Sequence, residues 1–245
     1  MSTMPVKPIM TELISEAAVG KSHTSLLFSN PVLVDLTVGG KSKFNVQKLY
    51  PKDWESRYFR IVIYEDIIKA LAKAHTDGRK TFIIETGTEL RLLLGERALK
   101  DVQKENTKRE ALSTYEWKGA NNLFKTIVGR CLEEYKMNLV ITAELNDEWK
   151  NKEKTGRRER DGYPKMDFYC DLRLYMKIEE EITSVNPEVK TKKRIAQVVK
   201  NGLIDSLSTE WIGSIELLYD NDPSKGETFK KIMELTKLQE ERWVK

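Results

Sequence analysis

The chain has 245 residues, of which 40% are hydrophobic and 33% are charged, and its formal net charge is +4. A chain of this length buries a substantial core in one large domain, and this composition excludes intrinsic disorder. No apolar run approaches the roughly 20 residues that span a bilayer, and the first ten residues lack the apolar stretch of a secretion signal, so we expect a cytoplasmic protein with no membrane partner.

The few cysteines and histidines narrow the range of chemistries. Cys131 and Cys170 stand singly in apolar segments, which predicts buried free thiols rather than a disulfide or a metal site. His23 and His75 are the only histidines, so the sequence does not support a histidine metal centre or a Ser-His-Asp triad.

Strands and helices alternate along the first 145 residues. Apolar runs rich in β-branched residues predict strands at 9–14, 31–38, 59–64, 80–85 and 138–143. Helical spacing predicts helices at 21–29, 65–75, 88–108 and 117–136. This order favours an α/β fold with a mainly parallel central sheet flanked by helices, and such sheets bind ligands at the carboxyl ends of their strands.

The remainder of the chain has a different pattern. Residues 167–181 and 190–202, joined by a short turn, predict a β-hairpin. Residues 226–245 have amphipathic spacing and predict a closing helix. We therefore expect a core domain at 1–202 and a C-terminal helical extension at 203–245.

The segment SEAAVGKS, residues 15–22, joins the first predicted strand to the first predicted helix. It ends like the phosphate-binding loop G-x-x-x-x-G-K-[ST], in which the glycine permits close backbone approach, the lysine reaches the β- and γ-phosphates and the hydroxyl residue ligates magnesium. The candidate nucleotide-binding residues of this segment are Ser15, Glu16, Ala17, Ala18, Val19, Gly20, Lys21, Ser22 and His23.

Carboxylates lie in or close to the carboxyl-terminal parts of three predicted strands. Glu85 ends the strand at 80–85, in the Walker-B arrangement, where a carboxylate holds magnesium or its waters. Ser22 and Glu85 are therefore the candidate magnesium residues. Asp35 lies within the run at 31–38, and Glu144 follows the strand at 138–143. We expect Glu85, Asp35 and Glu144 to contribute to catalysis.

These features, in this order, resemble the RecA-like P-loop ATPases, and most of all the small ATPases of phages and archaeal viruses linked to recombination and single-strand annealing. The resemblance covers residues 9–202 and rests on SEAAVGKS, VLVDLTVGG, FIIETGTEL, the tryptophan-led helix before NLVITAE, and VVKNG. It implies ATP and Mg²⁺ as cofactors, single-stranded DNA as a partner and a homo-oligomer. It also implies that Lys200, in VVKNG, reaches the nucleotide of a neighbouring subunit.

Four positions depart from the family pattern. Ser15 replaces the first glycine of the loop, and Val38 stands where an acidic residue is common. Glu85 replaces an aspartate, and Glu144 replaces a histidine or glutamine. The lysine and the hydroxyl residue of the loop are retained, so we expect nucleotide binding and leave hydrolysis open.

The positive charge is concentrated in one segment. Residues 149–165 contain seven basic and three acidic residues, an excess equal to that of the whole chain. In RecA-like recombinases the loop after the corresponding strand contacts DNA, so we expect this loop to bind phosphates of single-stranded DNA. The alternative is a solvated surface loop. The candidate DNA-binding residues are Lys150, Lys152, Lys154, Arg157, Arg158 and Arg160.

Three functions remain open at this point. The first is a Mg²⁺-dependent ATPase that acts on single-stranded DNA. The second is a degenerate nucleotide-binding regulatory or interaction module without turnover. The third is a small-molecule phosphotransferase, for which the sequence offers no clear Gly/Arg-rich lid. Turnover stimulated by single-stranded DNA would select the first function, and tight nucleotide binding without turnover the second.

Overall fold

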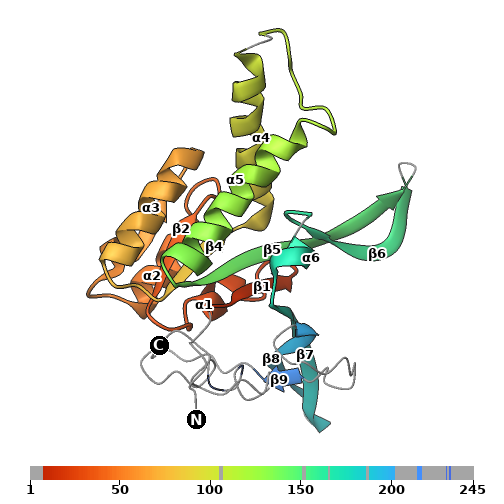
Figure 1. Cartoon of the computed structure of the whole chain (residues 1–245). Coiled ribbons are helices and arrows are strands. Elements are labelled where there is room, and N and C mark those ends of the chain that lie inside the picture. Colours follow the sequence, from red (N-terminus) through yellow and green to blue (C-terminus); the bar gives the residue numbers. More distant parts are fainter. Residues whose placement is uncertain are drawn as a thin grey trace, which may run out of the picture.

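The fold is described from a computed structural model of the chain. The structure describes residues 8–104, 107–150, 153–164, 166–185, 188–201, 214–216, 230 and 232. Within these residues the strands form one sheet with the order β3-β2-β4-β5-β1-β7-β8-β9, and β6 pairs with β5 off this path (Figure 1).

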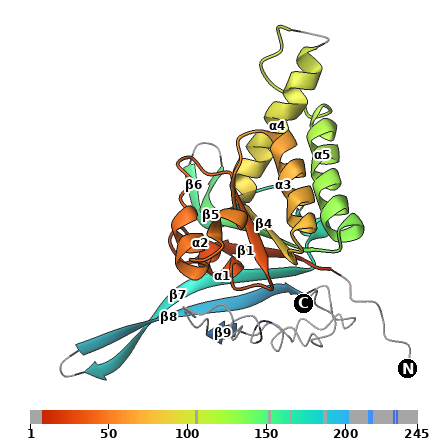
Figure 2. The same cartoon turned by 90° about the vertical axis from the view of Figure 1, so that its left-hand side faces the viewer.

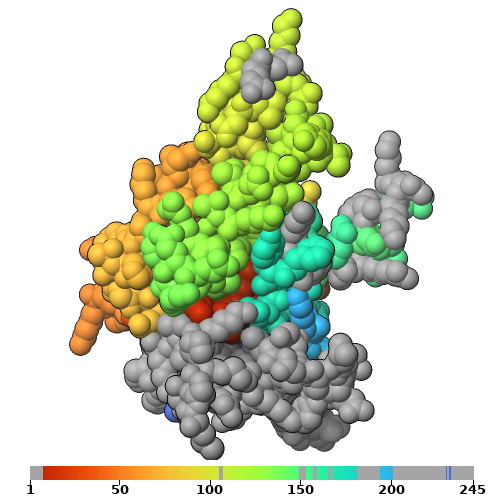
Figure 3. Space-filling model, in the orientation of Figure 1, coloured from red at the N-terminus to blue at the C-terminus, as the bar shows by residue number. Residues whose placement is uncertain are grey.

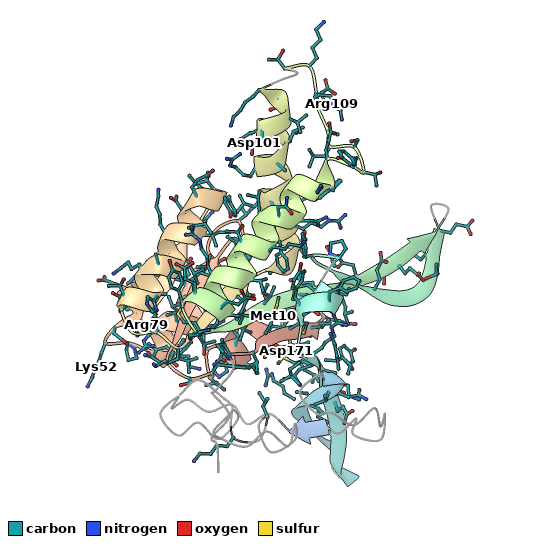
Figure 4. All side chains as sticks on the ribbon, in the orientation of Figure 1. Met10, Lys52, Arg79, Asp101, Arg109 and Asp171 are labelled. Carbon is teal, nitrogen blue, oxygen red and sulfur yellow. The ribbon has the colours of Figure 1, made fainter. Side chains whose placement is uncertain are left out.

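The central part of the sheet is parallel. Its strands are β1 Met10–Ser15, β2 Pro31–Asp35, β3 Tyr58–Arg60, β4 Thr81–Glu85, β5 Asn138–Lys150 and β7 Leu172–Val185. The antiparallel strands are β6 Glu153–Asp161 on β5, β8 Glu188–Asn201 on β7, and β9 Ser214–Glu216 on β8. At the start of β1 the amide of Met10 donates a 2.9 Å hydrogen bond to Asp171, just before β7, and Figure 4 labels both residues.

Helices lie on both faces of the sheet, as Figure 2 shows. The helical segments are α1 Lys21–Ser25, α2 Lys43–Leu49, η1 Trp54–Ser56, α3 Tyr64–Thr76, α4 Gly87–Gln103, α5 Trp117–Gly129, η2 Arg130–Glu134 and α6 Met166–Tyr169. Side chains alternate across each strand. On β4, Phe82 and Ile84 belong to the apolar cluster formed with α3, α4 and α5, whereas Ile83 belongs to the cluster that contains residues 26–28, just after α1, and α2. The core thus has two apolar layers, one on each face of the sheet.

The predicted α/β fold is confirmed, with a mostly parallel central sheet flanked by helices. The hairpin predicted from 167–181 and 190–202 is confirmed as β7 and β8. Its predicted start was too early, because β7 begins at Leu172 and Met166–Tyr169 form the helix α6. Cys131 and Cys170 are buried and free, as expected, and burial raises the pKa of both thiols. Among the described helices, none is long and apolar enough to cross a membrane.

The predicted strand at 59–64 was too long. β3 ends at Arg60, Val62 is 66% exposed, and Tyr64 already begins α3. Among the described strands, β3 pairs with β2 alone, and the last residue of β2, Asp35, lies opposite Arg60. Beyond Arg60 the chain therefore has no described strand to pair with. The predicted helix at 21–29 is also shorter, since α1 ends at Ser25 and the chain continues in a tight turn.

The sequence predicted a loop for the basic segment at 149–165. The structure instead places most of this segment in a β-hairpin. β5 continues past the sheet to Lys150 and returns as β6. This β5–β6 hairpin, residues 144–161, projects away from the body of the molecule in Figure 1 and stands apart from it in Figure 3. The helix predicted at 226–245 lies outside the described residues, apart from Lys230 and Ile232, which are both helical.

Candidate nucleotide-binding site

The parallel strands bring the predicted loop and the predicted carboxylates to one edge of the sheet. The register places Ser15 of β1 beside Glu144 of β5, and Asp35 of β2 beside Glu85 of β4. All four residues lie at the edge of the sheet where its parallel strands have their carboxyl ends, and parallel sheets bind their ligands at this edge. Residues far apart in the sequence therefore surround the loop at 15–22.

The loop backbone reaches α1 through two left-handed residues, Ala18 with φ 62° and Gly20 with φ 108°. Gly20 immediately precedes α1, and its φ explains why glycine is required there. Among the described residues, the non-glycine positions with positive φ are Ala18, Asn30 and Lys136, so Ser15 is not one of them. The first position of this loop therefore does not need the conformational freedom of glycine.

Lys21 is held inside the loop. Its side chain is buried, with the residue 6% exposed, and its ammonium donates to the Ser15 carbonyl at 3.1 Å, to Ser15 Oγ at 3.1 Å and to the Glu16 carbonyl at 2.9 Å. Burial lowers the pKa of Lys21, and the charges of Glu144 and Glu85 oppose that fall. The lysine is thus placed at the loop, with its charge facing two carboxylates.

Glu85 and Ser22 form the other half of the site. The Ser22 hydroxyl donates a 2.7 Å hydrogen bond to Glu85 Oε1. Burial raises the pKa of Glu85 to about 7, although the hydroxyls of Ser22 and Thr142 and the charge of Lys21 favour its ionised form. Within the described part of the chain, Glu85 Oε2 and Thr142 Oγ1 are buried without a hydrogen bond of normal geometry.

This arrangement suits a magnesium ion. Mg²⁺ prefers oxygen ligands and retains several waters, so it is bound by few protein groups. Ser22 Oγ and the orphaned Glu85 Oε2 supply a hydroxyl and a carboxylate, and Ser42 Oγ lies 3.4 Å from Ser22 Oγ. An orphaned buried carboxylate oxygen is costly without a cation or water. The residues present therefore fit the ion that the loop implies.

Asp35 has a different surrounding from that of Glu85. Its carboxylate is fully buried and accepts from the amide and hydroxyl of Thr37, the amide of Ser42 and the hydroxyl of Tyr58, at 2.6–3.2 Å. These four donors occupy both oxygens. Asp35 therefore fixes the turn at 37–42, which places the Ser42 hydroxyl near that of Ser22. Asp35 does not line the cavity over the loop.

A cavity of about 320 Å³ opens over the loop. Of the predicted residues, those lining it are Ala18, Gly20, Lys21, Ser22, His23, Glu85 and Glu144. Ser15 lies beneath Lys21, and Glu16 and Ala17 face outward. The carbonyl of Val19 accepts a 3.2 Å hydrogen bond from Arg194 of β8, so the β7–β8 hairpin contacts the loop at Val19.

Phe44, Asn45 and Lys48 of α2 also line the cavity, and the sequence reasoning missed them. Phe44 is 70% exposed although it is a large apolar side chain. Their position in the sequence could have indicated this role. They lie on the helix that follows the strand at 31–35 after one turn, and the carboxyl end of that strand lies at the site. Ser42, in the turn segment GGKSK, was missed as well.

Lys200 lies on β8 opposite Arg173 of β7, and Arg173 in turn pairs with Glu12 of β1. Lys200 is not among the residues that line the cavity. Its predicted role concerned the nucleotide of a neighbouring subunit, so that role stays a prediction.

The predicted DNA-binding residues are distributed along the β5–β6 hairpin. Lys154 pairs with Asp147 at 2.6 Å. The backbone register places Arg158 opposite Asp147 and Lys150 opposite Glu153. Lys152 and the side chains of Lys150, Arg157 and Arg158 lie outside the described part. Residues 144–161 contain six basic and six acidic residues, so the hairpin as a whole has no excess positive charge.

Arg160 has a structural task that the sequence did not reveal. Glu12, fully buried in β1, accepts from Arg160 at 2.8 Å and from Arg173 at 2.6 Å. An unpaired buried carboxylate is strongly unfavourable, whereas two guanidinium groups satisfy both of its oxygens. Arg160 thus fastens the base of the hairpin to β1, and its contact with DNA stays a prediction.

Comparison with known proteins shows the family of the chain and supports its fold. Residues 7–209, most of the chain, match the model of the family described as AAA domain (AAA_24). No curated protein matches the chain. Among solved structures, a KaiC-like protein from the hyperthermophilic archaeon Pyrococcus horikoshii OT3 is similar in fold, with a TM-score of 0.51, 10% sequence identity and 88% of each chain covered. At this identity the likeness concerns the fold alone, and it agrees with the predicted RecA-like fold.

Proposed function

The chain belongs to the AAA domain family, and on that premise we propose that it binds ATP with Mg²⁺ over residues 15–22 and hydrolyses it in work on single-stranded DNA. One observation carries the nucleotide site: the buried ammonium of Lys21 and the hydrogen-bonded pair Ser22–Glu85 line one cavity. An ammonium, a hydroxyl and a carboxylate in one cavity match the groups that P-loop ATPases use for phosphates and magnesium.

Each residue has a definite task in this proposal. Lys21 pairs with the β- and γ-phosphates, and Ser22 and Glu85 hold magnesium, which neutralises charge on the phosphate oxygens when bound. Glu144, the other carboxylate of the cavity wall, orients the attacking water. Asp35 positions the turn that carries Ser42. Phe44 of α2 offers an exposed ring for the base.

Replacement of Lys21 tests the nucleotide site directly. Lys21→Ala removes the ammonium, so the affinity for ATP·Mg²⁺ measured by calorimetry should fall by roughly a hundredfold or more. Lys73→Ala is the matched control, because Lys73 is an exposed α3 lysine paired with Asp77. Equal ATP affinity in the Lys21 variant and the wild type would rule out the loop as the binding site.

The DNA part of the proposal concerns the tip of the β5–β6 hairpin. A projecting strand pair with lysines and arginines can follow a single-stranded backbone, and Trp149 can stack on a base. Because Asp147 and Glu153 lie opposite Arg158 and Lys150, only a few phosphates are neutralised. We therefore expect weak binding with a shallow salt slope, of about −0.7 for each phosphate contacted.

Charge reversal at the hairpin tests this proposal. Arg157→Glu with Arg158→Glu should weaken binding of a labelled oligonucleotide, measured by anisotropy at several salt concentrations with ATP·Mg²⁺ present, and should flatten the salt slope. Lys69→Glu with Lys73→Glu makes the same charge change on α3 and should leave both unchanged. Absence of binding by the wild type at low salt would overturn the DNA role and leave the nucleotide site standing.

A second candidate function is a nucleotide-binding module without turnover. It is favoured by Val38, 80% exposed in the turn after β2, where the family resemblance expects an acidic residue, and by the saturated carboxylate of Asp35. A phosphate-release assay with and without single-stranded DNA separates the two functions. Turnover supports the ATPase, and nucleotide binding without any phosphate release supports the module.

The proposal includes a homo-oligomer in which Lys200 of one copy approaches the nucleotide of the next. Light scattering with and without ATP·Mg²⁺ should show assembly that depends on nucleotide. Lys200→Ala should then lower turnover without lowering the nucleotide affinity of a single copy. A monomer in both conditions would remove this part of the proposal.

A further inference from the structure

Ser15 stands where the phosphate-binding loop pattern has its first glycine, and its hydroxyl is engaged with the loop's own lysine. The Ser15 residue is fully buried, and its Oγ accepts from Lys21 Nζ at 3.1 Å while donating to the Glu16 carbonyl at 2.7 Å. The backbone of Ser15 has no positive φ. The serine is therefore tolerated on conformational grounds, and its hydroxyl adds a contact that a glycine lacks.

The ammonium of Lys21 is saturated by this arrangement. A lysine ammonium has three N–H donors, and Lys21 makes three hydrogen bonds, to Ser15 O, Ser15 Oγ and Glu16 O. To contact phosphate oxygens, the ammonium has to release at least one of these acceptors. Hydrogen bonds of charged groups are the strong ones, so each acceptor held in the free protein competes with the phosphates.

Of the three acceptors, only Ser15 Oγ depends on the side chain at this position. The two carbonyls belong to the backbone and remain whichever residue is present. We propose that the Ser15 hydroxyl is a latch that holds Lys21 away from the phosphates and so weakens the binding of nucleoside di- and triphosphates. The inference rests on the proposed nucleotide site, and it assigns to Ser15 a positioning role within that site.

The latch acts only on ligands that recruit the lysine. Lys21 is expected to reach the β- and γ-phosphates, so ATP and ADP compete with Ser15 Oγ, whereas AMP, with only an α-phosphate, does not. A change of the loop's shape would instead alter the affinity of all three nucleotides. The ratio of ADP affinity to AMP affinity therefore separates a latch from a structural effect.

The test compares Ser15→Ala and Ser15→Gly with the wild type. Both variants remove the hydroxyl, and they differ in backbone freedom. Calorimetry with ATP·Mg²⁺ and ADP·Mg²⁺, and competition with AMP, should show Kd values for ATP and ADP about tenfold lower in both variants, with AMP unchanged. Ser25→Ala is the matched control, because it removes an equally buried hydroxyl that bonds to Ser22 O and not to Lys21.

Each outcome decides between the ideas. Unchanged or weaker ATP binding in both Ser15 variants, beside a wild type that binds ATP, overturns the latch and leaves the nucleotide site intact. A parallel change for ATP, ADP and AMP, or a gain in Ser15→Gly alone, also overturns it. ATP binding in neither the wild type nor the variants overturns the nucleotide site and the latch together. Binding that appears only in the variants supports both.

Discussion

The hydroxyl of Ser22 donates a 2.7 Å hydrogen bond to Oε1 of Glu85, which joins the first turn of α1 to the end of β4. The two residues are 63 positions apart in the chain, and the parallel pairing of β1, β5 and β4 brings them together. Within the described residues, the second carboxylate oxygen of Glu85 is buried without a hydrogen bond of normal geometry. A cation or a water at this oxygen would complete the surroundings of the Ser22–Glu85 pair.

Glu85→Gln should separate binding from hydrolysis. The amide oxygen of glutamine still accepts from Ser22, and Lys21 remains for the phosphates, so ATP affinity should change little. Loss of the negative charge that holds magnesium should lower phosphate release by about a hundredfold or more. Glu96→Gln, at an exposed position of α4, is the control. Unchanged turnover in the Glu85 variant would mean that this carboxylate only ends a strand.

The pKa of Glu85 predicts how stability depends on pH in the absence of nucleotide. Burial raises this pKa from 4.5 to about 7, so between these values the folded protein holds a proton that the unfolded chain has released. The free energy of unfolding should therefore fall as the pH rises from about 4.5 to 7, by about 3 kcal/mol in total, and then level off. Urea unfolding at several pH values measures this, and Glu85→Gln should lack the decline. Identical pH profiles for the two proteins would contradict the assignment.

Phe44→Ala should weaken the binding of ligands that contain a base. Phe44 lines the cavity and is 70% exposed, and base–aromatic stacking contributes about 1–3 kcal/mol, so ATP affinity should fall by about fivefold or more. The affinity for inorganic triphosphate with magnesium should not change. Phe168→Ala, exposed on α6, is the control. Equal losses for ATP and triphosphate would place the base elsewhere.

Asp35→Asn should destabilise the fold more than Tyr58→Phe. The asparagine amide would turn an N–H₂ group toward donors that now meet a carboxylate, at a cost of about 2–4 kcal/mol. Tyr58→Phe removes one donor at 3.2 Å and should cost about 1 kcal/mol. Urea unfolding compares the two variants. Similar losses would show that the turn at 37–42 does not depend on the charge of Asp35.

Glu12→Gln should be among the most destabilising conservative changes in the sheet. Glu12 is buried between Arg160 and Arg173, and loss of its charge leaves two guanidinium groups poorly compensated, at about 3–5 kcal/mol. Arg160→Glu should unfold the base of the hairpin for the same reason, whereas Arg157→Glu with Arg158→Glu should not. Thermal unfolding distinguishes them, and full stability of Glu12→Gln would contradict the role of this ion-pair triad.

The sequence by itself determined the features that depend on short stretches of chain. The alternation of apolar runs and amphipathic helices predicted the parallel sheet, because side-chain period follows directly from strand and helix geometry. The Gly20-Lys21-Ser22 tripeptide predicted the loop, because the glycine conformation and the two functional groups are properties of adjacent residues. The carboxylates at strand ends predicted the edge at which a ligand would bind.

The tertiary structure alone decided which of those residues serve the site. Asp35 and Glu85 look alike in sequence, since each is an acid in or at the end of an apolar run. In the structure Asp35 accepts from Thr37, Ser42 and Tyr58, whereas Glu85 Oε2 has no hydrogen bond of normal geometry from a described residue. In the sequence Arg160 belongs to a basic segment, whereas in the structure it pairs with Glu12, 148 residues away. Hydrogen-bond saturation and the desolvation of a charge depend on every group within a few ångströms, and those neighbours come from distant parts of the chain, so no local pattern records them.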